Sequence, residues 1–189
     1  MAGEAGLLVL GWALGHWLGI WPAERLHLSP RAVGLGLAAA LPLLAGLWWT
    51  VTTGLDPVRR LVDLVMQQLG PVLAARSAAE LALLAALAGV AEEFLFRGVI
   101  QVGLTELLPR GMALVVASVA FGLAHFITPT YAVLAGGAGL YLGALYLLQG
   151  NLLVPIVAHA FYDFVALLYL VRRYRASQIA SAPPPAGTS

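Results

Sequence analysis

The stretch Leu81–Arg97, LALLAALAGVAEEFLFR, places two carboxylates and one guanidinium in an otherwise apolar segment. An ionised side chain at bilayer depth costs about 2.5–3.5 kcal/mol on insertion scales, and such residues usually face a polar cavity. The run before Glu92 contains neither a proline nor a charge, which favours a continuous helix. We therefore expect a membrane helix that presents Glu92, Glu93 and Arg97 to an internal, water-lined site.

The composition of the whole chain is typical of an integral membrane protein. Of its 189 residues, 61% are hydrophobic and only 10% are charged, and the mean hydropathy is +0.90. A soluble domain has about 25% charged residues. The net charge of +1 leaves no extended basic surface for a nucleic acid, so we expect no such partner. The chain has no cysteine, which excludes disulfides and thiolate metal sites.

About six transmembrane helices are predicted, because a helix needs roughly 20 apolar residues to cross about 30 Å of hydrocarbon. The candidate spans are 5–21, 32–53, 78–108, 112–127, 131–149 and 152–171. The third span is longer than a perpendicular crossing needs, so it must tilt or project from the bilayer. The predicted fold class is an all-α polytopic bundle, with one membrane-embedded domain at 1–171 and a motif-bearing core at 78–171.

Two further segments lie outside these spans. Residues 56–70 carry apolar side chains at helical spacing opposite Arg59, Arg60 and Asp63, which predicts an amphipathic helix along the membrane surface. Residues 172–189 are polar and rich in proline, which predicts a disordered tail.

The arginines predict the orientation of the bundle. Six spans place both termini on one side of the membrane, together with Arg59, Arg60, Arg76, Arg172, Arg173 and Arg175. The opposite side has only Arg25, Arg31 and Arg110. The positive-inside rule therefore predicts cytoplasmic N- and C-termini. The compact length, the short loops and the absence of lysine favour a bacterial plasma membrane.

The two adjacent carboxylates have different local partners. Glu93 precedes Arg97 by four residues, the favourable order for an ion pair on one helix face. Glu92 lies about 100° round the helix, and its fourth neighbour is Phe96, so its own helix supplies no cation. We expect the first pair to be structural and Glu92 to act as a general base or acid.

Two histidines in later apolar helices are candidates for the same site. His125 follows Phe121 by four residues, and His159 precedes Asp163 by four, so each pair shares a helix face. An aspartate beside an imidazole can fix its tautomer. Two histidines and a carboxylate can hold a catalytic metal, or they can bind water and a developing oxyanion without one. His16 and His27 have no such pattern. We expect a structural hydrogen-bonding role for His16 and a solvated surface position for His27.

Several protease patterns are absent. The chain contains no HExxH zinc motif and no serine site of the GxSG kind. Tyr162-Asp163 is similar to the first half of an aspartyl intramembrane protease signature, but no second intramembrane aspartate follows.

The three motifs, EExxxR at Glu92–Arg97, FxxxH at Phe121–His125 and HxxxD at His159–Asp163, resemble those of a family of intramembrane proteases. This is the CAAX-protease and bacteriocin-processing (CPBP, or Abi) family. The order and the spacing match over roughly residues 78–171. The last motif most often ends in asparagine in this family. Asp163 lacks that amide donor, so it could orient His159 instead.

The resemblance implies an endopeptidase that hydrolyses peptide bonds of membrane-associated peptides or proteins. By matched position, Glu92 would activate water with help from His125, and His159 and Asp163 would stabilise the oxyanion. The remaining motif residues, Glu93, Arg97 and Phe121, would shape the site. Members of the family have been discussed both as metalloproteases and as glutamate-dependent proteases without a metal. Only two histidines are available here as nitrogen ligands, which favours the metal-free mechanism. Zinc held by Glu92, His125 and His159 is the alternative.

Two non-catalytic functions use the same ionisable residues. A small proton-coupled transporter would pass protons along them, and a membrane scaffold would bind a partner through them. A transporter predicts paired repeats with interrupted helices, and no such duplication is visible. The predicted spans also place His125 near the end of its helix, away from Glu92 and His159. If the motifs converge, either the fourth span is longer or the third helix sits lower.

Overall fold

The computed structural model describes residues 2–181, and it gives side-chain positions for residues 5–180. This part of the chain is all-helical and contains no strand, as predicted. The first half comprises α1 (Ala2–Leu18), the short η1 (Pro22–Arg25), α2 (Pro30–Thr52) and α3 (Asp56–Ala74). The second half comprises α4 (Ala78–Glu93), η2 (Phe94–Gln101), α5 (Val102–Leu104), α6 (Arg110–Ala124), α7 (Pro129–Gln149) and α8 (Leu153–Ser181).

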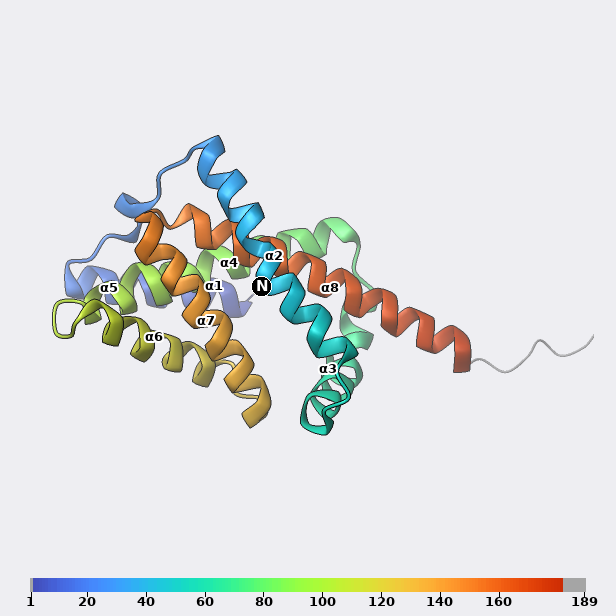
Figure 1. The fold of residues 1–189 in the computed structure, drawn as a ribbon. Coiled ribbons are helices and arrows are strands. Elements are labelled where there is room, and N and C mark those ends of the chain that lie inside the picture. Colours follow the sequence, from blue (N-terminus) through green and yellow to red (C-terminus); the bar gives the residue numbers. More distant parts are fainter. Residues whose placement is uncertain (1, 182–189) are drawn as a thin grey trace, which may run out of the picture.

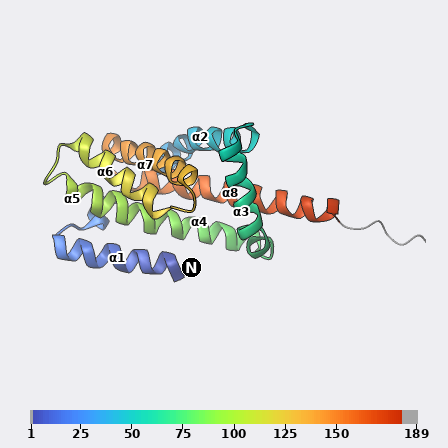
Figure 2. The ribbon, with the colours of Figure 1, turned by 90° about the horizontal axis from the view of Figure 1, so that it is seen from below.

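The long helix α8 is the central element of the bundle. It packs against α4 on one side and against α2 and α3 on others, while α6 and α7 form a close pair (Figure 1). Figure 2 shows α1 along the outside of α4, on the side away from α2. This arrangement surrounds the α4–η2 segment with α1, α6, α7 and α8, which buries the middle of the motif helix.

Local sequence signals set the helix ends. The hydroxyls of Ser29 and Thr128 accept hydrogen bonds from the third helical N–H of α2 and α7, and a proline follows each cap. Ser77 and Glu80 form a capping box at the start of α4. The last residues of α7 lead into Gly150, whose φ of +63° favours glycine because it has no Cβ. These caps explain why most predicted spans lie within a few residues of the helices.

The predicted number of about six spans is not confirmed. Within the described residues, three helices are long and apolar enough to cross a membrane: α2, α7 and Leu153–Ala180 of α8. The apolar helices Ala5–Leu18 and Arg110–Ala124 are shorter. The predicted span 78–108 is divided by η2, a π-helical segment, and its helices end at Leu104. The apolar helices nevertheless indicate an integral membrane protein.

The predicted boundary between domain and tail, at residue 171, lies too early. Helix α8 continues to Ser181 because its polar end packs on α3. Arg175 donates a hydrogen bond to the Ala74 carbonyl at 2.7 Å, and the ring of Tyr174 lies directly against Gly70. The rest of the predicted tail, 182–189, lies outside the described residues. The predicted amphipathic segment 56–70 is helical, and α3 buries Val58, Leu61 and Leu73.

Glycines allow α6 and α7 to approach each other closely beside the site. A Cβ on Gly122 would lie 2.5 Å from the Ala132 carbonyl oxygen, whereas a Cβ on Gly137 would meet nothing within 4 Å. We expect Gly122→Ala to destabilise the protein by about 1–3 kcal/mol through overpacking. Thermal unfolding in detergent should show a lower Tm for Gly122→Ala and none of this loss for Gly137→Ala. An equal Tm for the two variants would contradict the close contact.

Candidate active site

The seven predicted site residues lie together at the junction of three helices. Glu92 and Glu93 end α4, and Arg97 follows in η2. His125 directly follows α6, four residues after Phe121. His159 and Asp163 lie on one face of α8. Helix α6 ends at Ala124, before the predicted 127, so the convergence does not come from a longer fourth span.

Glu93 and Arg97 form the buried ion pair that their spacing predicts. Arg97 Nη1 donates to Glu93 Oε1 at 2.8 Å, and the two residues are 1% and 0% exposed. Arg97 Nη2 donates to the Gly139 carbonyl on α7 at 2.9 Å. The guanidinium also lies 4.5 Å from the centre of the Phe121 ring, within the range of a cation–π contact. The pair therefore joins the motif helix to α6 and α7.

Glu93 holds His159 as well as Arg97. His159 Nδ1 donates to the same oxygen, Glu93 Oε1, at 2.8 Å. Because an ionised carboxylate only accepts hydrogen bonds, this partner assigns the proton to Nδ1 of His159. From the sequence, Asp163 was expected to fix the tautomer of His159. In the structure, Glu93 fixes it. Asp163 Oδ2 instead lies 3.5 Å from Nε2, at the opposite edge of the ring.

His125 is oriented in a similar way by its own helix. Its Nδ1 donates to the Phe121 carbonyl oxygen at 2.9 Å, and its ring centre lies 4.4 Å from that of Phe121. A carbonyl is an acceptor, so Nδ1 carries a proton here too. Both imidazoles consequently turn Nε2 toward the same space.

That space also contains the carboxylate of Glu92. Glu92 Oε2 lies 3.3 Å from His125 Nε2 and 3.8 Å from His159 Nε2. These separations exceed the usual length of a direct N–H···O bond, and within the described residues Oε2 has no hydrogen-bond partner. Glu92 has no cation on its own helix, but two imidazoles from other helices face it. One carboxylate oxygen and two imidazole nitrogens therefore lie around one space.

Exposure differs across the cluster. The side chains of Asp163 and His125 are 27% and 24% exposed, Glu92 is 13% exposed, and His159 and Glu93 are nearly or fully buried. The site is therefore open at Asp163 and His125 and closed at the Glu93–Arg97 pair. A polar group that reaches Glu92 would approach from the end where α6 turns into α7.

The part of the chain that contains these site residues also matches a known protein family. Residues 74–165 match the family model described as type II CAAX prenyl endopeptidase Rce1-like. This segment therefore matches the CPBP/CAAX protease family. The matched segment contains all three motifs and ends two residues after Asp163, so the resemblance in the sequence is confirmed. No curated protein and no solved structure gave a match.

The donor set of this CPBP domain does not form a ready metal site. Within the described part of the chain, no group of three or more His, Cys, Asp or Glu side chains is arranged to hold a metal ion. The possible zinc ligands, Glu92, His125 and His159, do not form such a group. No step below is therefore derived through a metal.

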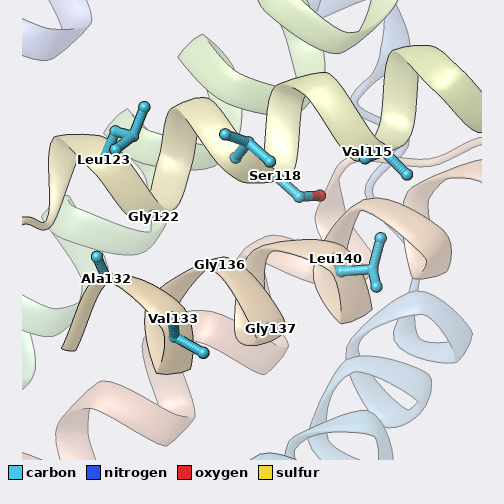
Figure 3. A pocket seen from close by; sticks show the side chains of 10 residues that line it. Val115, Ser118, Gly122, Leu123, Ala132, Val133, Gly136, Gly137 and Leu140 are labelled. Atoms are coloured by element: carbon cyan, nitrogen blue, oxygen red, sulfur yellow. The ribbon is translucent and has the colours of Figure 1, made fainter. Parts of the chain in front are cut away.

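An apolar groove lies beside the CPBP site but does not contain its chemistry. It has a volume of about 390 Å³ and lies between α6 and α7 (Figure 3). Its lining includes Val115, Leu123, Val133 and Leu140 and the small residues between them. The Ser118 hydroxyl, its one side-chain polar group, donates to the Leu114 carbonyl at 2.7 Å. The groove offers contact to hydrocarbon and no acid or base.

Two polar side chains near the CPBP site were not foreseen from the sequence. Tyr131, in the first turn of α7, has its ring centre 6.1 Å from that of His125. Gln101, four residues after Arg97, donates from Nε2 to the Gly143 carbonyl at 3.1 Å. The repeated four-residue spacing of Glu93, Arg97 and Gln101 was a signal for Gln101. No pattern in the sequence pointed to Tyr131, because its neighbours are on other helices.

Proposed function

We propose that this CPBP-domain protein is an intramembrane endopeptidase in which Glu92 activates a water molecule. One observation carries the proposal: Glu92 Oε2 and the Nε2 atoms of His125 and His159 converge from three helices. Glu92 Oε2 makes no hydrogen bond within the described residues, so this oxygen can accept one from a water molecule.

The proposed reaction is general-base hydrolysis of a peptide bond. Glu92 takes a proton from water, and His125 Nε2 orients that water. The water oxygen bonds to the scissile carbonyl carbon, and the carbonyl electron pair moves to its oxygen. His159, protonated at both nitrogens and held by Glu93, donates from Nε2 to this oxyanion. Glu92 then gives its proton to the leaving nitrogen as the carbon–nitrogen bond breaks.

Asp163 and the buried pair support this reaction without touching the scissile bond. The Asp163 carboxylate lies 3.5 Å from His159 Nε2, so it stabilises the imidazolium before substrate arrives. Arg97 balances the charge of Glu93 within the bundle. Phe121 packs against Arg97, His125 and His159, and it keeps the two imidazoles in position.

The surroundings of the site support a membrane-associated substrate. Helices α6 and α8, which position His125 and His159, are apolar, and the groove beside the site lies between α6 and α7. We propose peptides or membrane proteins as substrates, a bacterial plasma membrane as the location and cytoplasmic N- and C-termini. The orientation rests on the distribution of arginines.

The first test compares peptide termini in membranes that contain the wild type or Glu92→Gln at matched levels. Peptide termini that appear only with the wild type would establish proteolysis and identify both substrate and cleavage position. Identical termini, together with proton flux that only the wild type supports, would favour the proton-coupled transporter. Identical termini without such flux would favour a non-catalytic scaffold.

A metal measurement tests the proposed water activation independently. We expect active wild type and His125→Ala to contain the same, substoichiometric amount of zinc, since no step uses a metal. We also expect wild-type cleavage to continue after dialysis against a chelator. Elemental analysis of both purified proteins gives the first result, and the peptide assay gives the second. Stoichiometric zinc in the wild type that is lost in His125→Ala would overturn the metal-free mechanism.

A further inference from the structure

The proposed hydrolysis creates a negatively charged oxygen in a site whose other groups are mostly acceptors. The groups facing it are the carboxylates of Glu92 and Asp163 and the Nε2 atoms of His125 and His159. A carboxylate repels an oxyanion, and an imidazole donates from Nε2 only when it is protonated. A neutral donor beside these groups would stabilise the oxyanion without adding to the charge of the site.

Tyr131 is the phenol nearest to this space by its described ring contacts. Its backbone N–H donates to the Thr128 hydroxyl at 3.1 Å, which fixes it in the first turn of α7. Its ring is edge-on to His125, with a centre-to-centre distance of 6.1 Å and an interplanar angle of 76°. The residue is half-buried at the end of α6, where the site is open to its surroundings.

The hydroxyl of Tyr131 is free to act at the site. Within the described residues it makes no hydrogen bond, whereas the Tyr141 hydroxyl, also on α7, donates to the Ala39 carbonyl at 2.8 Å. The Tyr131 phenol lies close enough to the carboxylates of Asp163 and Glu92 to be affected by their charges. Tyr146 of the same helix instead packs with Leu152 and Ile156 in an apolar cluster.

A packing role alone does not account for the hydroxyl of Tyr131. A phenylalanine would make the same ring contact with His125 as Tyr131 does. The hydroxyl adds a polar group near two carboxylates and makes no hydrogen bond within the described residues. A substrate carbonyl oxygen at the site would supply an acceptor for it.

We infer that the Tyr131 hydroxyl is a further catalytic donor, which binds the scissile carbonyl oxygen and the oxyanion formed from it. The inference rests on the proposed endopeptidase function. The phenol donates a hydrogen bond and keeps its proton throughout, so it adds no step to the reaction. It acts together with His159 Nε2, and the two donors approach the oxygen from α7 and α8.

The test compares Tyr131→Phe with Tyr146→Phe, using the substrate peptide that the terminus comparison identifies. Removing one oxyanion donor lowers kcat by about 10²- to 10³-fold. We expect this loss for Tyr131→Phe, with KM within about twofold of the wild type, because the donor acts most strongly on the transition state. Tyr146→Phe should retain wild-type kcat, and Tyr131→Phe should keep the wild-type Tm.

Three results would overturn the inference. The first is an unchanged kcat in Tyr131→Phe while the wild type cleaves, which would leave the proposed function intact. The second is a loss confined to Tyr162→Phe, which would assign the donor to the neighbouring phenol of α8. The third is a wild type without peptidase activity, which would remove the proposed function and this role together.

A second variant preserves the shape of the side chain in case Tyr131→Phe unfolds. Difluorotyrosine at position 131 keeps the hydroxyl, but this phenol loses its proton more readily than tyrosine does. A deprotonated phenol cannot donate, so the alkaline limit of kcat should move to lower pH. An alkaline limit identical to that of the wild type would show that the phenol is not a donor in the reaction.

Discussion

Glu92→Gln is expected to lower kcat by about 10⁴-fold, the upper end of what a general base contributes. The amide cannot accept a proton from water at neutral pH, yet it has nearly the same shape as the carboxylate. Glu92 Oε2 lies 3.3 Å from His125 Nε2 and makes no hydrogen bond within the described residues, so the fold loses little when its charge is removed. Initial rates on the identified peptide, measured at equal amounts of folded protein, give the ratio.

A matched change at the edge of the site controls for charge alone. Asp163→Asn also removes one negative charge, but Asp163 Oδ2 lies 3.5 Å from His159 Nε2, whereas Glu92 Oε2 lies 3.3 Å from His125 Nε2. We expect this variant to retain more activity than Glu92→Gln by at least about tenfold, because the general base is still present. Equal losses in the two variants would show that total charge, and not the base at Glu92, determines the rate.

The positions of the helices could be predicted because apolar runs are local signals. In the structure, Ser29 and Thr128 cap the starts of α2 and α7, and Gly150 follows the end of α7. The end of α8 was missed because Arg175 is polar, and only its tertiary contact with Ala74 explains why the helix continues there. The π-helical segment at 94–101 was also missed, since its residues show no pattern that differs from an α-helix.

Contacts within the site were predicted where two residues share a helix face. Contacts between residues on different helices were missed. The four-residue spacing identified the Glu93–Arg97 pair, which the structure contains. It could not identify the bond from His159 to Glu93, because 66 residues separate them. The same limit applies to Tyr131, whose ring contact with His125 depends on how α6 and α7 pack. Spacing within a helix is therefore informative about partners, whereas contacts between helices require the packed bundle.

Glu93→Gln is expected to destabilise the protein by about 3–5 kcal/mol, the usual cost of leaving one partner of a buried ion pair alone. Glu93 Oε1 accepts hydrogen bonds from both Arg97 and His159, and the carboxylate is fully buried. Glutamine retains an oxygen acceptor but lacks the charge that balances Arg97. Thermal unfolding in detergent, together with the yield of folded protein, should therefore rank Glu93→Gln well below Glu92→Gln. Equal Tm and equal yield for the two variants would contradict a structural role for the pair.

The double variant Glu93→Gln/Arg97→Gln separates the lost charge from the lost contacts. It removes the uncompensated guanidinium, so we expect it to be less destabilised than the sum of the two single changes. Arg97 also donates to the Gly139 carbonyl and covers Phe121, so a part of the loss should remain. Activity should not return, since His159 Nδ1 still lacks the Glu93 carboxylate that orients the ring. An additive double variant would mean that Glu93 and Arg97 contribute independently, and that the buried charge of Arg97 is balanced by another group.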